Sequence, residues 1–339
     1  DRDALFIDFE KAVLEKRIKT LFCGAYDDTF KKNYNIYDSD SYKLTKVIAG
    51  KKYNHDNIKD IQYRPFDNRY IYYERGITSR PAYEVVKHFL AGENIAFVLL
   101  RNMPSFENWS GVFITANMAE FGIGGSFPGN SAPVFPLYLY PNESSLDKTE
   151  KRRPNLNPAI VQEVASKTGL SFTEEKDDTE NTFAPIDILD YIYAALYSNN
   201  YRRKYKEFLK IDFPRVPYPE NAEQFHKLAS IGSLLRGLHL MENVTPIMGM
   251  ADFPVPGTNE IETVNYKAEK VYVNKQQYFE NIPPEIWGYY IGGYQPAEKW
   301  LKDRKGRVLS FEDIEHYQKI ITALKITIAL QAQIDGALQ

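Results

Sequence analysis

The sequence predicts an α+β fold: a mixed, mostly antiparallel sheet with flanking helices, followed by a helical subdomain that carries a returning β-hairpin. Three observations support this fold class. Strand-like stretches concentrate in the first half of the chain, apolar stripes at helical spacing dominate from residue 157 onward, and alternating stretches return after residue 255. A chain of 339 residues exceeds one average core, so two subdomains are expected.

The composition restricts the class of protein. The chain is 43% hydrophobic with a mean hydropathy of −0.46, and it shows neither an apolar run long enough for a transmembrane helix nor a signal peptide. The single cysteine, Cys23, cannot form an internal disulfide, which fits a reducing cytoplasm. We therefore expect a cytoplasmic protein with no membrane partner. Because the sequence opens at Asp1 without a methionine, it suggests a piece of a longer polypeptide.

The net charge of −3 argues against a protein that attracts nucleic acid over its whole surface, because such domains are usually basic. Any DNA contact would have to use local basic patches, or positive charge from parts of the polypeptide that this sequence lacks. The chain also has 25 tyrosines, and a tyrosine ring carries both apolar area and a hydroxyl at recognition surfaces. Tyrosine is equally common at the edge of a core, so the excess favours recognition only weakly.

Near the N-terminus, residues 9–22 place apolar side chains at helical spacing, which predicts an amphipathic helix. If a preceding domain is missing, part of its apolar stripe should be uncovered. The polar segment 26–61 contains one short predicted helix, at residues 41–49, which Gly50 ends.

The stretch 63–80, YRPFDNRYIYYERGITSR, combines four arginines with five aromatic rings. A strand over residues 69–73 would place Tyr70 and Tyr72 on one face and Arg69, Ile71 and Tyr73 on the other. Guanidinium groups beside flat rings suit a surface that grips phosphates and base edges. The alternative is a strand with a solvated arginine face and with tyrosines at the core boundary.

Three further strands and a helix follow. Pro81 favours a helix start and Gly92 a stop, so residues 81–91 should be helical. The apolar run 94–101 predicts a buried strand that delivers Arg101 and Asn102 at its end, where they could contact a ligand; a surface ion pair is the alternative for Arg101. Residues 111–116 and 133–140 are also expected to be strands.

Cap residues define the helices of the second half. Helix starts are predicted at Asn157 and Asn221, and Ser310 with Asp313 forms a capping box for the last helix, which should pack back on the helical core. Apolar spacing predicts a core helix over residues 185–198 and a second helix over 201–209. The helix that begins at Asn157 should end at Gly169, the proline-rich stretch 213–219 should be an extended link, and residues 260–266 and 270–273 should form the hairpin.

A second basic stretch, GGYQPAEKWLKDRKGR, ends at Arg307 and is the densest positive cluster in the chain. Trp300 would anchor it. A cationic turn beside an aromatic ring can clamp phosphates, and a solvated turn after a short helix is the alternative. Its basic residues are Lys299, Lys302, Arg304, Lys305 and Arg307.

The sequence offers no catalytic motif that we would defend. It lacks the NPPY-type tetrapeptide of adenine methyltransferases, a convincing S-adenosylmethionine motif and a Walker lysine loop. Its five histidines are scattered without metal-ligand spacing. The loop Gly122–Asn130 is rich in glycine but does not match a dinucleotide fingerprint. We therefore predict no catalytic residue, no cofactor site and no metal site in this chain.

Several blocks resemble, in the same order, the C-terminal specificity region of type ISP restriction-modification enzymes, large bacterial proteins with nuclease, translocase, adenine methyltransferase and target-recognition parts. YRPFDNRYIYY and NIAFVLLR are similar to the start of that region. The later similar blocks are FPLYLYP, the run at residues 190–219 that ends in PRVPYP, and the tryptophan- and lysine-rich block at residues 291–321.

This resemblance implies a domain organisation. Residues 1–25 would be a linker helix from an absent upstream methyltransferase domain, residues 26–150 an α+β target-recognition subdomain, and residues 151–339 a mainly helical subdomain. The resemblance also implies that S-adenosylmethionine binds in the upstream domain. The partners would be double-stranded DNA and the methyltransferase and translocase or nuclease domains of the same polypeptide.

The leading hypothesis is thus a sequence-specific DNA recognition module that is not itself an enzyme and that directs an adenine methyltransferase to its site. The alternatives are a stand-alone hydrolase or transferase with a pocket at Gly122–Asn130, and a tyrosine-rich module that binds protein or carbohydrate. The first hypothesis requires the two basic stretches to converge on one groove wide enough for a double helix. The candidate DNA contacts are Arg64, Arg69, Arg75, Arg80, Arg101, Asn102, Lys299, Lys302, Arg304, Lys305 and Arg307.

Overall fold

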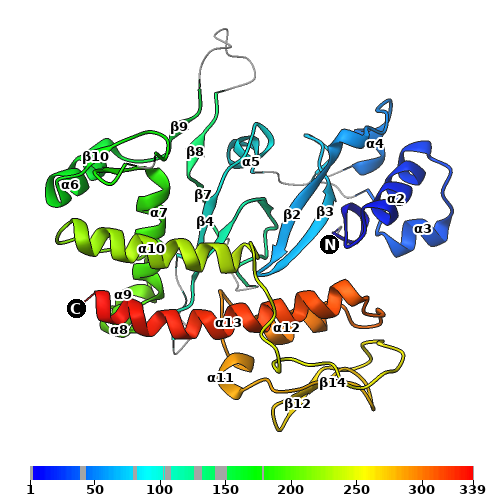
Figure 1. The fold of residues 1–339 in the computed structure, drawn as a ribbon. Helices are drawn as coiled ribbons and strands as arrows, with labels where there is room; N and C mark the ends of the chain where they lie inside the picture. The colour runs from blue at the N-terminus through cyan, green and yellow to red at the C-terminus, as the bar shows by residue number, and fades with distance from the viewer. Residues whose placement is uncertain are drawn as a thin grey trace.

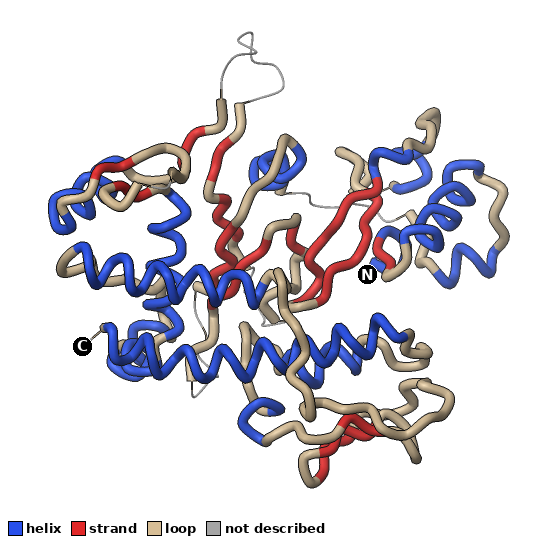
Figure 2. Tube along the Cα trace, viewed as in Figure 1, coloured by secondary structure: helices blue, strands red, loops and turns tan. Residues whose placement is uncertain are grey.

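The computed structural model describes residues 3–38, 43–78, 82–101, 103, 108–125, 132–141, 151–177 and 179–338. The α+β class is confirmed, but the strands form several small sheets instead of one (Figures 1 and 2). The N-terminal helices lie on one side of the sheets of the first half of the chain, and the long helices of the second half lie on the other side and below them in the view of Figure 1. No helix in the described residues combines the length and the apolar character that crossing a membrane requires.

The first sheet has the order β1-β3-β2-β6 and is built on a long hairpin. Its strands are β1 (Ile7–Asp8), β2 (Ile58–Arg64), β3 (Asp67–Tyr72) and β6 (Met118–Ala119). β3 pairs antiparallel with both β1 and β2, whereas β2 pairs parallel with β6. Short helices α1 (Asp3–Phe6), α3 (Asp28–Asn33) and α4 (Leu44–Ile48) and a 3-10 turn (His55–Asn57) surround this sheet.

The predicted alternation along β3 is confirmed, but both faces of the strand are covered. Tyr70 and Tyr72 face the amphipathic helix α2 (Lys11–Cys23), while Ile71 and Tyr73 pack on the other side. The expected uncovered part of the apolar stripe on α2 is confined to the edge of the stripe. Leu14, Ile18 and Leu21 are completely buried against the sheet. Of the apolar residues in the predicted stripe, Val13 alone is exposed, at 43%.

The second sheet, β5-β4-β7, consists of β4 (Ala96–Leu99), β5 (Val112–Thr115) and β7 (Val134–Pro136), all paired antiparallel. The predicted strand over residues 133–140 is in fact two strands, because the chain leaves the sheet after β7. Its second part, β8 (Tyr138–Leu139), pairs instead with β9 (Arg153–Pro154). The predicted helix after the arginine-rich stretch is α5 (Tyr83–Leu90).

The helical region follows the predicted caps. Asn157 and Asn221 accept hydrogen bonds from the first turns of α6 (Pro158–Thr168) and α10 (Ala222–His239), and Ser310 completes the capping box of α13 (Phe311–Ala337). α13 packs against α10 and α7, as expected. The other elements are α7 (Pro185–Tyr197), α8 (Asn199–Lys204), α9 (Lys206–Leu209) and the parallel pair β10 (Ser171–Phe172) and β11 (Thr182–Phe183).

One close contact between helices in this region requires a glycine. A Cβ atom added at Gly232 of α10 would lie 1.9 Å from the backbone oxygen of Asp190 in α7. Any side chain at this position would therefore push the two helices apart.

The returning hairpin is confirmed, but its predicted first strand at residues 260–266 is a strand only from residue 265, and a third strand that the sequence did not indicate joins it. β12 (Asn265–Lys267) pairs with β13 (Lys270–Tyr272), which pairs with β14 (Tyr278–Phe279). The chain then forms α11 (Pro284–Trp287) and α12 (Pro296–Lys302) before it enters α13. α12 packs beside α13 and therefore places the second basic stretch next to the long helix (Figure 1).

A buried histidine connects the three long helices with the β2–β3 turn. The Nδ1 atom of His239 lies 2.6 Å from the hydroxyl of Tyr193, and its Nε2 atom lies 2.8 Å from the hydroxyl of Thr327. Phe66, at the turn between β2 and β3, packs edge-on against the same ring. Burial lowers the pKa of His239 to about 3, so the ring is neutral at ordinary pH.

This histidine should make the stability of the protein depend on pH. Below pH ~6.5 the unfolded chain takes up a proton that the folded protein refuses until about pH 3, so stability is lost as the pH falls through this window. Between pH 6.5 and 4, the melting temperature of the wild type should fall more steeply than that of a His239→Gln variant. The slope from this one group reaches at most about 1.4 kcal/mol per pH unit.

His226→Gln is the matched control, because His226 lies on the same helix but is exposed. Its melting temperature should follow the wild-type pH profile. Parallel pH profiles for the wild type and His239→Gln would show that this histidine does not set the acid sensitivity.

Candidate nucleic-acid interface

The two basic stretches meet at a buried carboxylate. Asp67, at the start of β3, is 1% exposed, and its Oδ1 atom accepts a hydrogen bond of 2.9 Å from Nη2 of Arg304. Its Oδ2 atom accepts bonds of 2.7 and 3.1 Å from Arg69. Arg69 also lies 3.6 Å from Asp303, next to Arg304 in the chain. The predicted convergence of the hairpin with the basic turn is therefore real, and it takes place through ion pairs.

Aromatic rings enclose the same arginines. The guanidinium carbon of Arg304 lies 3.6 Å from the centre of the Trp300 ring and 4.6 Å from that of Phe9. Arg69 lies 4.0 Å from the Phe9 ring and 3.7 Å from the Tyr63 ring. Phe9, on the segment between β1 and α2, thus joins the N-terminal segment to both basic stretches. The solvated-arginine interpretation is wrong for Arg69, whose side chain is 10% exposed.

The electrostatics of this cluster favour the charged pair. Burial by itself would raise the pKa of Asp67, but the guanidinium groups of Arg304 and Arg69 outweigh burial and hold that pKa below its ordinary value. His316 of α13 contributes a neutral ring, because burial lowers its pKa, and its Nε2 atom lies 2.8 Å from the carbonyl oxygen of Phe66. The hairpin turn is thereby attached to α13 as well as to α12.

A surface pocket of about 480 Å³ opens beside the ion pairs. Its lining includes Phe9, Asn68, Arg307 and His316, and the carboxylates of Glu10 and Asp313 also face it. A pocket of this volume admits a side chain or a single planar group. This pocket is too small to hold a double helix, so it is not itself the groove that the convergence hypothesis requires, and that groove stays a prediction.

Around the buried core of the cluster, three cations remain at the surface. Lys305 is exposed, and the side chain of Lys302 is 52% exposed although it pairs with Glu298 at 2.8 Å. Arg307 is 37% exposed and pairs with Glu10 at 2.8 Å. Lys299 is more enclosed, because it pairs with Asp303 and lies 5.4 Å from the Tyr294 ring.

The place where the two basic stretches meet, at Asp67, Arg69 and Arg304, is called the basic junction. Arg64 also lies near it, but its side chain points to the glycine-rich loop. Its side chain is 12% exposed, pairs with Glu120 and stacks on Tyr63 at 4.0 Å. The Tyr294 ring lies 5.4 Å from the same guanidinium, so Arg64 bridges the hairpin and the segment that precedes α12.

Other candidates lie elsewhere or cannot be placed. Arg75 is exposed over the Tyr83 ring at 4.1 Å. It lies three residues beyond Tyr72, where β3 ends, whereas Asp67 begins that strand. Arg101 is 66% exposed and forms the surface ion pair that was the alternative to a ligand contact, at 3.3 Å from Asp212 in the helical region. Arg80 and Asn102 lie outside the described residues.

The glycine-rich loop is closely packed over its described part, residues 122–125. A Cβ atom at Gly124 would lie 2.6 Å from Leu100, and Gly293 donates a 2.8 Å hydrogen bond to the carbonyl oxygen of Gly124. Tyr294 also donates a 2.9 Å bond to the carbonyl oxygen of Gly122. This segment is therefore a structural contact in its described half, and residues 126–130 lie outside the described residues.

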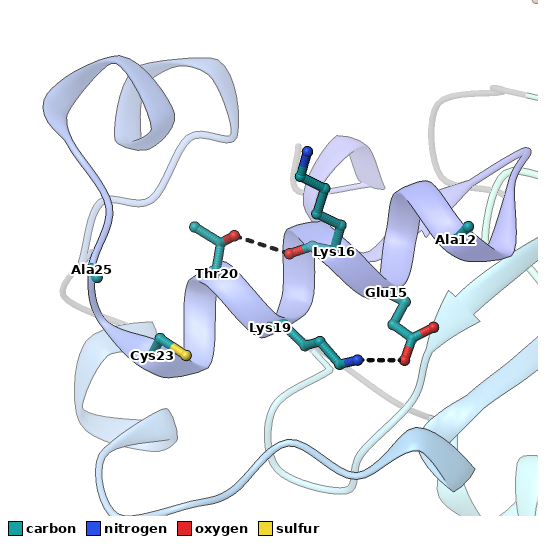
Figure 3. A pocket seen from close by; sticks show the side chains of 7 residues that line it. All are labelled: Ala12, Glu15, Lys16, Lys19, Thr20, Cys23 and Ala25. Atoms are coloured by element: carbon teal, nitrogen blue, oxygen red, sulfur yellow. Dashed lines mark hydrogen bonds and ion pairs between the residues drawn. The ribbon is translucent and has the colours of Figure 1, made fainter.

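A second cavity, of about 480 Å³, runs along the outer face of α2 (Figure 3). Its ionisable groups do not form a catalytic arrangement. Glu15 is paired with Lys19 at 2.8 Å, while Cys23 lies eight residues further along the helix, about 12 Å away at 1.5 Å per residue. Across the described residues, no group of three or more His, Cys, Asp or Glu side chains is placed to hold a metal ion.

Sequence reasoning missed the residues that organise this cluster. Asp67 and Asp303 were visible only as charges that oppose the arginines, and Phe9 only as part of a helical stripe. Glu120 and His316 gave no signal at all. A tightly packed arginine needs a buried acceptor, so the arginine-rich stretch itself could have directed attention to Asp67.

The fold and the cluster define a class of α+β domain in which a basic helix–turn is fixed against the end of a β-hairpin. The particular family follows from the sequence. The model of the Type ISP C-terminal specificity domain matches residues 1–331, and the chain belongs to this family. No curated protein matches the sequence.

Solved structures of low sequence identity share the fold. The ATP-dependent Type ISP restriction-modification enzyme LlaBIII bound to DNA is 18% identical with a TM-score of 0.72, over 100% of this chain and 22% of that one. The cryo-electron microscopy structure of the DrdV–DNA complex is 20% identical with a TM-score of 0.72, over 98% and 34%. A nuclease-deletion mutant of the Type ISP enzyme LlaGI with a DNA substrate mimic is 17% identical with a TM-score of 0.64, over 98% and 27%.

The buried pair predicts a large effect for one substitution. Arg304→Met should lower the free energy of unfolding by roughly 3 kcal/mol, because it leaves the buried Asp67 with Arg69 as its remaining partner. Urea unfolding measures this change. Adding Asp67→Asn should recover part of the loss, since the uncompensated charge is then removed.

Lys305→Met, at the next residue, is the control. Lys305 is exposed, so this change should stay within about 0.5 kcal/mol of the wild type. If Arg304→Met were as stable as Lys305→Met, the ion pair would not hold the two segments together.

Proposed function

We propose that this chain recognises the DNA target of a restriction-modification enzyme and directs an adenine methyltransferase, and a nuclease where one is present, to that site. One observation carries the proposal: the family is that of a specificity domain, and its basic turn is fixed by buried ion pairs with Lys302, Lys305 and Arg307 left at the surface. The solved neighbours that share this fold were determined in complex with DNA or a DNA mimic.

The parent polypeptide is part of this proposal. The chain spans only about a fifth to a third of the length of the solved chains that it matches. We assign the methyl transfer, and the S-adenosylmethionine that supplies the methyl group, to other parts of such a polypeptide. The residues of this chain would then select the sequence and perform none of the chemistry.

The exposed and the buried cations would have different roles. Lys302, Lys305 and Arg307 are accessible to phosphates and would fix the position of the duplex. Arg69 and Arg304 are already satisfied by Asp67, so they would act by holding the turn in place. The rigid attachment matters because phosphate contacts set the register in which bases are read.

Asn68 is a base-reading candidate that sequence reasoning missed. It is exposed on β3, lines the junction pocket and directly follows Asp67. A carboxamide can bond to adenine at N6 and N7 at the same time.

The alternatives receive less support. A tyrosine-rich binding module requires exposed rings, yet Tyr72, Tyr193, Tyr197 and Tyr317 are among the largest completely buried side chains. A hydrolase pocket at the glycine-rich loop is disfavoured by the packing of its described half.

Removing two surface lysines should weaken DNA binding without changing stability. A Lys302→Ala/Lys305→Ala variant should bind duplex DNA at least about tenfold more weakly at low salt, because two phosphate contacts are lost. The slope of log K against log salt should decrease by about 0.9 per lost contact. Fluorescence polarisation with a labelled mixed-sequence duplex at several salt concentrations measures both quantities.

Lys43→Ala/Lys46→Ala is the charge-matched control, because both lysines are exposed near α4, far from α12 in the fold (Figure 1). Equal loss of binding in both double variants would reduce the effect to net charge and contradict a specific contact.

Asn68→Ala should relax specificity more than affinity. Selection of duplexes from a randomised library should yield a wild-type consensus that becomes degenerate at one or two positions in the variant, at a cost of about 1–3 kcal/mol in discrimination. An unchanged consensus would remove Asn68 from the base-reading surface.

A further inference from the structure

A third cavity lies far from the basic junction, in the helical region. It has a volume of about 530 Å³, within the range of about 300–1,000 Å³ that is usual for binding pockets. It lies between α8, α9 and the extended link 213–217. In Figure 1 these elements lie near the C-terminal end of α13, whereas α12 lies beside the other half of that helix.

The pocket is a built structure. Tyr201 donates a 2.8 Å hydrogen bond to the carbonyl oxygen of Arg215, and Tyr191 donates a 3.0 Å bond to that of Pro217. Phe213 packs edge-on against Phe135 of β7. The link is therefore held away from α9 at fixed points, and the space between them persists as a preformed feature.

The lining of the pocket is apolar and exposed at its rim. Phe208 and Ile211 are each 70% exposed, while Leu209 at the base is 1% exposed. Apolar side chains that are exposed next to a concave surface mark contact sites more often than chance exposure does.

The rim carries a charge opposite to that of the whole protein. Residues 199–218 contain six lysines and arginines and two carboxylates, whereas the whole chain has a net charge of −3. Arg203, Lys204 and Arg215 are exposed, and the two carboxylates pair with Lys210 and Arg101. The unbalanced charge of this segment is therefore positive. Arg215 lines the pocket itself, and Lys204 lies 5.4 Å from the ring of Tyr205, which also lines it.

We propose that this pocket, the α9 pocket, docks an acidic amphipathic helix of a protein partner. An apolar side chain of that helix would enter between Phe208 and Ile211, and its carboxylates would face Lys204 and Arg215. Such a helix presents anchors at positions i, i+3 and i+4 on one face and acids on the other. The α9 pocket and the basic junction are separate surfaces, so this proposal does not depend on the proposed DNA contact.

The charge pattern argues against two other occupants. A second copy docked through the same face would bring two positively charged rims together, which costs binding energy. Duplex DNA would satisfy the cations, but its sugar–phosphate surface offers no apolar side chain for a pocket with a hydrophobic lining.

The test uses the whole 339-residue chain and a fluorescein-labelled, 16-residue synthetic peptide with leucines at helical spacing and glutamates elsewhere. This peptide should bind with micromolar affinity, and a peptide with lysine in place of glutamate should not. Phe208→Ser and Arg215→Glu should each weaken binding at least about tenfold, and both residues are exposed enough for the variants to fold. Lys302→Ala/Lys305→Ala should bind the peptide like the wild type.

Three results would overturn the proposal. The first is absent or charge-independent peptide binding. The second is loss of DNA affinity in Phe208→Ser or Arg215→Glu together with displacement of the peptide by duplex DNA, which would make the surface a nucleic-acid contact. The third is a concentration-dependent dimer in sedimentation that Phe208→Ser abolishes, which would make a second copy the occupant.

Discussion

The carboxylate of Asp67 binds two arginines that come from distant parts of the chain, and the arrangement of the basic surface depends on it. Arg69 belongs to the same strand, while Arg304 lies 237 residues away after α12. Two buried guanidinium groups can share one carboxylate because each bonds a different oxygen and each stacks on an aromatic ring. Removing the acid would leave two buried cations with only longer ion pairs, Arg69 to Asp303 at 3.6 Å and Arg304 to Asp313 at 4.0 Å, which is more costly than losing a surface pair.

This constraint explains how a protein with a net negative charge can present a local cationic surface. The acids Asp67 and Asp303 form ion pairs inside the basic junction, where they neutralise arginines that would otherwise repel one another. The cations that take no part in these buried ion pairs, above all Lys305, are exposed at the surface. Phe9 contributes to the same arrangement, so the N-terminal segment, the hairpin and the basic turn are fixed as one unit.

Local signals predicted local structure well. The caps at Asn157, Asn221 and Ser310 depend on residues within one turn, and all three helices begin as expected. The two faces of β3 also follow from a two-residue period. What could not be predicted is long-range. The pairing of β1 with β3 and the contact of Arg304 with Asp67 join segments whose spacing carries no pattern. For the same reason the sequence did not show that Arg75 and Arg101 lie in other parts of the fold than the basic turn.

The account's central claim is that the turn fixed by the Asp67–Arg304 pair is the surface that meets DNA. Acetylation of lysine side chains, quantified by mass spectrometry with and without duplex DNA, tests this claim most directly. The account predicts that DNA protects Lys302 and Lys305 from modification while Lys43 and Lys46 react as before. Equal reactivity of Lys302 and Lys305 in the free and DNA-bound protein, at a DNA concentration that saturates binding, would contradict it.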